Sequence, residues 1–234
     1  MNDSSAVFFH ALEGRIERYD LLKHPFYQAW SKGELTGEDL REYASEYWHH
    51  VSAFPAYLST LHSQLPDGNL RRVVLENLAD EEGLEGGGAP HSELWMDFAR
   101  GMGANEAEVR ERSVSNETRA MLAHFRAEMH SSPAAALAAL YTYESRVPAI
   151  AKTKAEGLKD HYGADDRTRR YFTVHTTADV HHARVWRNAL AEELLNHPEQ
   201  TGAALAAAED AARVLWTALD GVEAARQARM AAVA

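Results

Sequence analysis

The chain contains no cysteine among its 234 residues. This absence excludes disulfide bonds, iron–sulfur clusters, thiolate metal ligands and cysteine nucleophiles. Positive charge is also scarce, because 24 lysines and arginines stand against 35 aspartates and glutamates, which gives a net charge of −11. Proteins that bind nucleic acids usually present a basic face, so this balance argues against a nucleic-acid partner.

Long apolar runs are missing as well. No stretch reaches the roughly 18 consecutive apolar residues that a membrane-spanning helix needs, so we expect no membrane partner. The N-terminal stretch MNDSSAVFFHALEGR is acidic and lacks the charged-then-apolar pattern of a signal peptide. Together these absences predict a cytoplasmic protein.

The remaining composition, 45% hydrophobic and 25% charged, is ordinary for a globular protein. Apolar residues recur mostly at three- and four-residue steps, which is typical of helices, and no strand pattern or internal repeat stands out. Thr36 followed by Asp39 indicates a helix start at residue 37. We therefore predict an all-α protein with a single domain over residues 1–234 and a core over about 8–220. The expected helices cover residues 4–19, 21–30, 37–65, 69–84, 91–102, 105–130, 133–161, 165–196 and 198–230.

The stretch YFTVHTTADVHHARVW (171–186) contains three potential metal ligands in one register, His175, Asp179 and His182. On one continuous helix, at about 100° per residue, their side chains would share a sector about 60° wide. Two imidazoles and a carboxylate on one face suit iron, manganese or zinc. The ordinary alternative is a solvated helix face, since the chain has 13 histidines.

Other segments supply groups that could complete a dinuclear site of the kind that facing helices build in bundles. In NLADEEG, Glu81 and Glu82 end an amphipathic helix and Glu85 follows, and helical geometry leaves the choice among the three open. His91 begins a helix directly after the glycine-rich run GLEGGGAP. Glu144 lies among apolar residues in YTYESRVPAI, where an unpaired buried carboxylate would be unfavourable.

A competing motif is EYWHH, in which Glu46 and His49 form a Glu-x-x-His pair. Ferritin-like di-iron bundles need this motif twice. The sequence contains no second helical copy, so we interpret Glu46 and His49 as pocket lining or core.

With these segments considered together, the chain resembles the haem-oxygenase-like dimetal oxidases. Within them it is similar to the branch of the Chlamydia protein associating with death domains and its bacterial relatives. That branch is related in fold to pyrroloquinoline-quinone synthase and to thiaminase-II-like proteins. The stretches that match are LLKHPFYQAW, LREYASEYWHHV, NLADEEG, PHSELWMDFARGMG, YESRVPAIAKTKAEGLKDHYG and YFTVHTTADVHHARVW.

The resemblance implies a haem-oxygenase-like up-down helical bundle with a two-metal, O2-activating site. The cofactors would be two non-haem transition metals, Fe/Fe or Fe/Mn, together with O2 and an external reductant of unknown identity. Bundles of this kind often dimerise, so we expect a homodimer by analogy. The ligands that the resemblance implies are Glu81, His91, Glu144, His175, Asp179 and His182.

The same resemblance implies synthesis of para-aminobenzoate for folate. In that branch the carbon skeleton comes from one of the enzyme's own tyrosines, and the amino nitrogen comes from a lysine. The matching positions are Tyr27, Tyr43 and Lys154, and Tyr143 is a further candidate because it precedes a ligand. Helical geometry does not choose between Lys154 and Lys152, which each lie about 80° from Glu144. The ordinary alternatives are core aromatics with satisfied hydroxyls and a solvated surface lysine.

Other functions remain open to the same sequence. The same fold and metals could act on an external small molecule, or the chain could be a metal-free oxidase like pyrroloquinoline-quinone synthase. A non-enzymatic interaction module would instead be a metal-free bundle with an exposed apolar patch. The six ligand-type residues favour the metal-dependent oxygenase.

Overall fold

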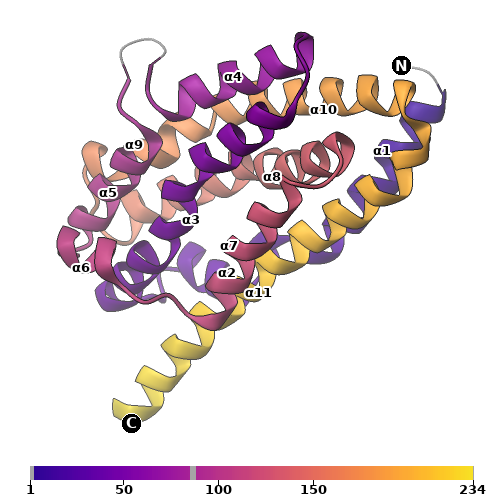
Figure 1. The fold of residues 1–234 in the computed structure, drawn as a ribbon. Helices are drawn as coiled ribbons and strands as arrows, with labels where there is room; N and C mark the ends of the chain where they lie inside the picture. Colours follow the sequence, from indigo (N-terminus) through magenta and orange to yellow (C-terminus); the bar gives the residue numbers. More distant parts are fainter. Residues whose placement is uncertain (1–2, 85–87, 234) are drawn as a thin grey trace.

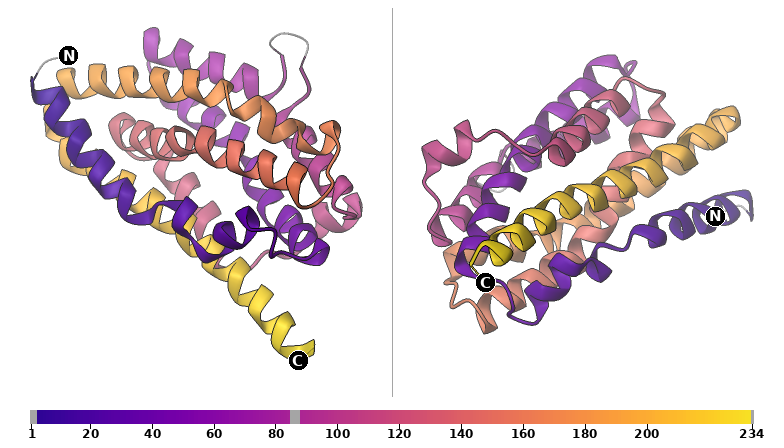
Figure 2. Two further views of the ribbon diagram at one scale, coloured as in Figure 1. Left: turned by 180° about the vertical axis from the view of Figure 1, so that it is seen from behind. Right: turned by 90° about the horizontal axis from the view of Figure 1, so that it is seen from below.

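The computed structural model describes residues 3–84 and 88–233, and these residues form helices and connecting loops without a strand (Figures 1 and 2). The predicted all-α class is confirmed. Short 3₁₀ helices, η1 (Glu17–Tyr19), η2 (Leu21–Lys23) and η3 (Pro198–Gln200), occur between longer elements. The α-helices are α1 (Asp3–Ile16), α2 (Pro25–Ser31), α3 (Gly37–Gln64), α4 (Asn69–Glu81), α5 (His91–Gly101), α6 (Glu106–Glu111), α7 (Asn116–Glu128), α8 (Pro133–Asp160), α9 (Asp166–His175), α10 (Ala178–Asn196) and α11 (Thr201–Val233). No helix among these described residues is both long and apolar enough to cross a bilayer.

Helix α8 lies at the centre of the bundle and packs against α9, α10 and α11 (Figure 1). Helix α11 runs along α7 and α8 and beside α1, and its last turns extend past the neighbouring helices (Figures 1 and 2). Alanines form much of the buried face of α11, and their small side chains let the helices approach closely. These alanines are Ala204, Ala207, Ala208, Ala211, Ala212 and Ala218.

Two hydrophobic clusters form the core. One contains Phe9 of α1, Tyr57 of α3 and Trp186 of α10, and the other contains Trp30 of α2 and Trp95 of α5. Helix α8 contributes to both clusters, with residues 134 and 136–141 in the first and residues 150, 151 and 158 in the second. The polar site described below uses the part of α8 that lies between these two groups.

The expected helix over 105–130 is wrong, because the chain forms α6 and α7 with a loop between them. Ser115 caps α7, and its backbone N–H donates a 2.8 Å hydrogen bond to the Glu46 carboxylate of α3. Arg112 in the same loop also pairs with Glu46. This tertiary contact holds the loop, and it gives Glu46 a structural partner in agreement with its interpretation as pocket lining or core.

The expected helix over 165–196 is also wrong, since α9 ends at His175 and α10 begins at Ala178. Between them, the Thr176 and Thr177 hydroxyls donate hydrogen bonds of 2.7 and 3.2 Å to carbonyls of the preceding turn. Such side-chain bonds compete with helix continuation. The ligand-type residues of this stretch therefore do not share a sector of one helix, and their positions depend on how α9 and α10 pack.

The N-terminal prediction needs one further correction. The expected helix over 4–19 ends at Ile16, and the expected helix over 21–30 begins only at Pro25. His24 caps α2, because its Nδ1 accepts a 3.1 Å hydrogen bond from the Phe26 N–H. The 3₁₀ turns between α1 and α2 turn the chain so that Tyr27 enters the second core cluster.

Candidate metal centre

One group of possible ligands joins the ends of three helices. Glu81 at the end of α4, His91 at the start of α5 and His175 at the end of α9 each offer an atom within 4.8 Å of the others. His91 Nδ1 lies 3.0 Å from Glu81 Oε2. His175 Nδ1 lies 2.6 Å from the Tyr171 carbonyl oxygen. A carbonyl can only accept, so Nδ1 carries the proton and Nε2 keeps a free lone pair.

A second group shares Glu81 with the first. Glu81, Glu144 of α8 and His182 of α10 also offer atoms within 4.8 Å of one another. Glu144 is only 1% exposed, and its Oε2 accepts a 2.7 Å hydrogen bond from Trp186 Nε1. The two groups of possible ligands therefore share one carboxylate, Glu81.

Two aspartates flank His182 on opposite sides of its ring. Asp80 Oδ2 lies 3.1 Å from Nε2, and Asp179 Oδ1 lies 3.4 Å from Nδ1. Because a carboxylate accepts, Asp80 holds the proton on Nε2 and leaves Nδ1 facing Asp179 and Glu144, the latter at 3.6 Å. Asp179 is buried and lines a small cavity together with Glu81, Glu144 and His175.

Several buried polar atoms here have no hydrogen-bond partner within the described part of the chain. They are Glu144 Oε1, His91 Nδ1 and His182 Nδ1. His91 Nδ1 is close to Glu81 Oε2, yet the two atoms are not oriented for a hydrogen bond. Buried polar groups are otherwise almost always paired, so atoms that converge without pairing are those expected of ligands to a shared ion.

The charges of the site also indicate a need for a cation. Burial raises the pKa of Glu144 well above its usual value, and the charges of Asp179 and Glu81 raise it further against the effect of His182. Burial lowers the pKa of His182, but the nearby carboxylates of Asp179, Asp80 and Glu144 outweigh it and bring the pKa to about 11. Without a metal ion, protons therefore supply the positive charge that this acidic cluster requires.

A separate cluster forms around Lys154 of α8. Its amine lies 2.8 Å from the Tyr27 hydroxyl and within hydrogen-bond distance of the Tyr43 hydroxyl, and the two hydroxyls are 3.0 Å apart. Lys154 is 4% exposed, and burial lowers its pKa well below the usual value. Burial raises the pKa of Tyr27 and of Tyr43 well above the usual value. Burial therefore favours the neutral amine of Lys154 and the neutral phenols of Tyr27 and Tyr43.

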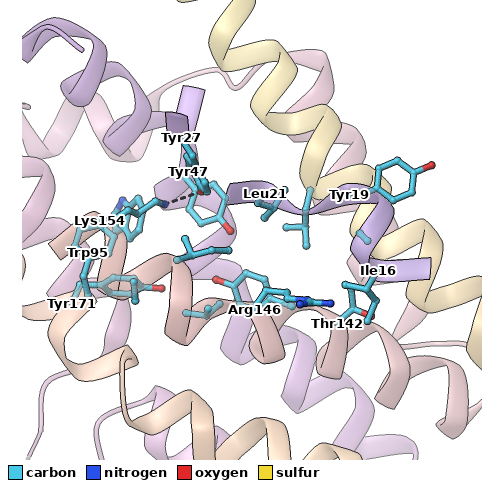
Figure 3. A pocket seen from close by; sticks show the side chains of 17 residues that line it. Ile16, Tyr19, Leu21, Tyr27, Tyr47, Trp95, Thr142, Arg146, Lys154 and Tyr171 are labelled. Carbon is cyan, nitrogen blue, oxygen red and sulfur yellow. Dashed lines mark hydrogen bonds between the residues drawn. The ribbon is translucent and has the colours of Figure 1, made fainter. Parts of the chain in front are cut away.

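A narrow channel leads from this lysine cluster toward the surface, and Figure 3 shows the side chains along it. Lys154 and Tyr27 lie at one end, and Arg146 lies near Ile16 and Thr142 at the other. Tyr143 and Tyr171 line both this channel and the small cavity of the metal cluster. These two tyrosines are the wall that separates the two sites.

Comparison with known families bears on this arrangement. A family model described as an iron-containing redox enzyme matches residues 41–216, well over half of the chain. The chain belongs to this family. The matched range contains all of the histidines and carboxylates in the two groups of possible ligands.

Several relatives of this iron-containing redox enzyme that are about 40% identical to it share one name. A protein of Chlamydia pneumoniae named 4-aminobenzoate synthase is 40% identical over 210 residues, which cover 89% of this chain and 91% of the relative. A protein of Nitrosomonas europaea with the same name is 39% identical over 228 residues, covering 92% and 91%. A solved structure from Shewanella denitrificans is described as a domain of unknown function with a heme oxygenase-like fold. It superposes on this chain with a TM-score of 0.76 and is 16% identical in sequence. The match covers 95% of this chain and 93% of the solved chain. The haem-oxygenase-like fold is thereby confirmed.

The histidines and carboxylates of this iron-containing redox enzyme are a donor set that fits iron, because imidazole and carboxylate groups are suitable iron ligands. Of the carboxylates left open by the sequence, Glu81 is buried within the cluster, Glu82 is exposed, and Glu85 lies outside the described residues. Sequence reasoning missed Asp80 and Trp186, which contact His182 and Glu144. Only their spacing from candidate ligands could have indicated them, because Asp80 lies one residue before Glu81 and Trp186 lies four residues after His182.

The two candidate lysines differ in burial. Lys154 is buried between Tyr27 and Tyr43, whereas Lys152 is exposed. The alternative that treated Lys154 as a solvated surface residue is therefore wrong. Tyr143 lines the small cavity of the metal cluster as well as the channel.

Proposed function

We propose that this chain is a dimetal O2-activating oxygenase that makes 4-aminobenzoate from one of its own tyrosine side chains, with Lys154 as the amine donor. The ions would be held by Glu81, His91, Glu144, His175, Asp179 and His182. This proposal takes up the name of relatives about 40% identical to the chain. The observation on which it depends is the buried contact between Lys154 and two tyrosines, next to a cluster of metal-ligand type.

The structure of the product explains why these residues must meet. In 4-aminobenzoate the amino and carboxyl groups stand opposite each other on the ring, as the hydroxyl and Cβ do in tyrosine. The nitrogen must therefore replace the phenol oxygen, and Cβ must leave Cα and become the carboxyl carbon. Lys154 Nζ lies 2.8 Å from the Tyr27 hydroxyl, so the donor nitrogen is already beside the ring position that it would occupy.

The burial of Lys154 favours the reactive form of its amine. Only a neutral amine is a nucleophile, and burial lowers the pKa of Lys154 toward that state. The amine lies among aromatic rings and hydroxyls, with Nζ 4.2 Å from the Tyr27 ring centre and 4.6 Å from that of Tyr43. The same closed aromatic environment keeps bulk water from the reacting groups.

The chemistry also needs an oxidant. Two iron or manganese ions in the adjacent cluster would pass electrons to O2 and supply the oxidising power, with an external reductant returning them to the reduced state. Tyr143 and Tyr171 lie between that cluster and the channel. Their role in this proposal is to close the metal cavity toward the lysine while keeping the two sites adjacent.

A genetic test separates the amine donor from its neighbour on the same helix. The chain should restore growth without added 4-aminobenzoate in a bacterial strain that lacks its own synthesis route. Lys154→Met, which keeps an apolar chain of similar length in the buried site, should abolish rescue. Lys152→Met is the matched control and should still rescue. Equal rescue by both variants would contradict the proposal.

A labelling experiment tests the tyrosine source. Protein made with ring-¹³C tyrosine, then reduced and exposed to O2 in unlabelled medium, should release labelled 4-aminobenzoate. The intact protein mass should fall by a tyrosine side chain and change further because Lys154 loses its amine nitrogen. Peptide mapping should place these changes at Lys154 and at Tyr27 or Tyr43. Tyr27→Phe and Tyr43→Phe variants then identify which one is consumed.

An external substrate is the second candidate, and the channel is the observation that favours it. A small aromatic or amine could enter past Arg146 and reach Lys154 without any protein side chain being consumed. In that case the labelling experiment gives unlabelled product and an unchanged protein mass. A metal-free oxidase is the less favoured alternative, because it would leave the unpaired ligand atoms of the acidic cluster unexplained.

A further inference from the structure

The channel has a polar residue at each end, Arg146 and Lys154, and apolar walls between them. The channel is narrow, and its lining is mostly apolar. Between Arg146 and Lys154 the walls are built from aromatic and aliphatic side chains such as Trp95, Ile150 and Leu215. The arginine end is the mouth, because the Arg146 side chain is 32% exposed whereas Lys154 is 4% exposed. A flat apolar ligand with one anionic end matches this shape and polarity.

Arg146 is poorly satisfied by the protein itself. Its Nη2 lies 3.5 Å from Glu13 and 3.5 Å from Glu17, at the limit of a weak ion pair. Its Nε is buried and has no hydrogen-bond partner in the residues that the structure describes. A guanidinium normally uses its planar N–H groups together on one acceptor, so Arg146 has donors available for a ligand.

The two neighbouring glutamates are already engaged by closer cations. Glu13 Oε1 lies 3.1 Å from Arg187 Nη1, and Glu17 Oε1 lies 2.8 Å from Lys23 Nζ. Arg146 is therefore the most weakly held cation of this group. A carboxylate arriving through the mouth could bind Arg146 without breaking a close ion pair.

We propose that the channel is a binding site for an aromatic carboxylate, with the carboxylate on Arg146 at the mouth and the ring between the apolar walls. The inference rests on the proposed function in one respect, that 4-aminobenzoate is the member of this ligand class expected there. The site then holds the product on its way out, with its carboxylate first to reach solvent. The nearby Glu13 and Glu17 weaken anion binding, which favours release over retention.

Binding can be measured without turnover. Isothermal titration calorimetry of the purified protein with 4-aminobenzoate and benzoate should show saturable binding to one site. Benzamide has the same ring but no charge, so it should bind at least about tenfold more weakly. Equal affinity for benzoate and benzamide would overturn the proposal, and so would an absence of benzoate binding.

Variants locate the carboxylate. Arg146→Gln should weaken benzoate binding by roughly tenfold to a hundredfold, the effect of losing a charged hydrogen-bond pair, while leaving benzamide binding unchanged. Lys152→Gln removes one positive charge from the exposed face of the same helix and should change affinity less than about twofold. Glu17→Gln removes a competing carboxylate and should tighten benzoate binding. Wild-type affinity in Arg146→Gln, checked for an unchanged circular dichroism spectrum, would overturn the assignment.

The two proposals can fail separately. Arginine-dependent benzoate binding in a chain that cannot rescue growth would reject the synthase function and leave the carboxylate site. Rescue of growth by a chain whose benzoate binding is insensitive to Arg146→Gln would reject the carboxylate site alone.

Discussion

Replacing Glu144 with glutamine should have opposite effects on the stability of the metal-free and the metal-bound protein. Glu144 is buried in a cluster that already contains Asp179 and Glu81. Burial raises its pKa well above the usual value, and those two carboxylates raise it further, although His182 acts in the opposite direction. In the absence of metal, the folded protein must therefore hold an unfavourable charge or take up a proton at this residue.

The sign of the pH dependence follows from proton binding. Above the unfolded carboxyl pKa of about 4.3, the folded state binds more protons at Glu144 than the unfolded chain does. Stability of the metal-free wild type should then fall as pH rises from about 4.3 through the raised folded pKa. Glutamine does not titrate, so Glu144→Gln removes this loss. The glutamine oxygen can still accept the hydrogen bond that Trp186 donates at 2.7 Å.

The size of the effect can be bounded from the contacts. His182 keeps Asp80 at 3.1 Å and Asp179 at 3.4 Å when Glu144 is neutralised, so its positive charge stays paired. An incompletely compensated buried polar group costs on the order of 1–3 kcal/mol. For a chain of this size each kcal/mol corresponds to about 2–4 °C, so the metal-free variant should unfold roughly 2–12 °C above wild type.

Thermal unfolding followed by circular dichroism in EDTA, near pH 6 and near pH 8, measures this difference. The variant's advantage should grow with pH. Glu82→Gln, which changes an exposed carboxylate one residue beyond Glu81, should shift the midpoint very little. Adding ferrous iron should stabilise wild type more than Glu144→Gln, because an ion that binds only the folded state raises its midpoint. A metal-free Glu144→Gln protein less stable than wild type near pH 8 would refute this reasoning.

Two further predictions concern residues that position the site. Asp80 lies 3.1 Å from His182 Nε2 and holds the proton on that nitrogen, and Asp80→Asn weakens this interaction. Metal affinity measured by chelator competition should therefore fall about 10–100-fold. Unchanged affinity would count against this role of Asp80. At Gly101 of α5 an added Cβ would overlap the Thr168 side chain of α9, so Gly101→Ala should lower the free energy of unfolding in urea by about 1–3 kcal/mol. Gly14→Ala is the helical control with no heavy atom within 4 Å, and it should raise the free energy of unfolding by about 0.5–1 kcal/mol. Equal effects of the two alanines would contradict the close packing of α5 on α9.

The sequence by itself determined the helical class and the bounds of the long central helices. The expected ranges 37–65 and 133–161 match α3 and α8 to within one residue at each end. Local chemistry explains this agreement, because Thr36 and Asp39 form a capping box and Ser132 caps α8 ahead of Pro133. The homodimer expected from analogy stays a prediction.

The sequence also identified the residue types that meet in the candidate centre, but not the choice among neighbours. Glu81 and Glu82 are adjacent in one acidic run, and only the end of α4 buries the first and exposes the second. Lys152 and Lys154 are equally distant from Glu144 on a helical projection, and only the packing of α2 and α3 on α8 selects Lys154.

Tertiary structure alone decided how the groups face one another. The break at Thr176 and Thr177 removes the single-helix register, yet His175 and His182 reach the same centre because α9 and α10 both pack on α8. The Asp80 contact with His182 and the weak pairing of Arg146 depend equally on neighbouring helices. Periodicity along a chain reports which face of a helix is buried, whereas the partner across the interface is set by the packing of segments far apart in sequence.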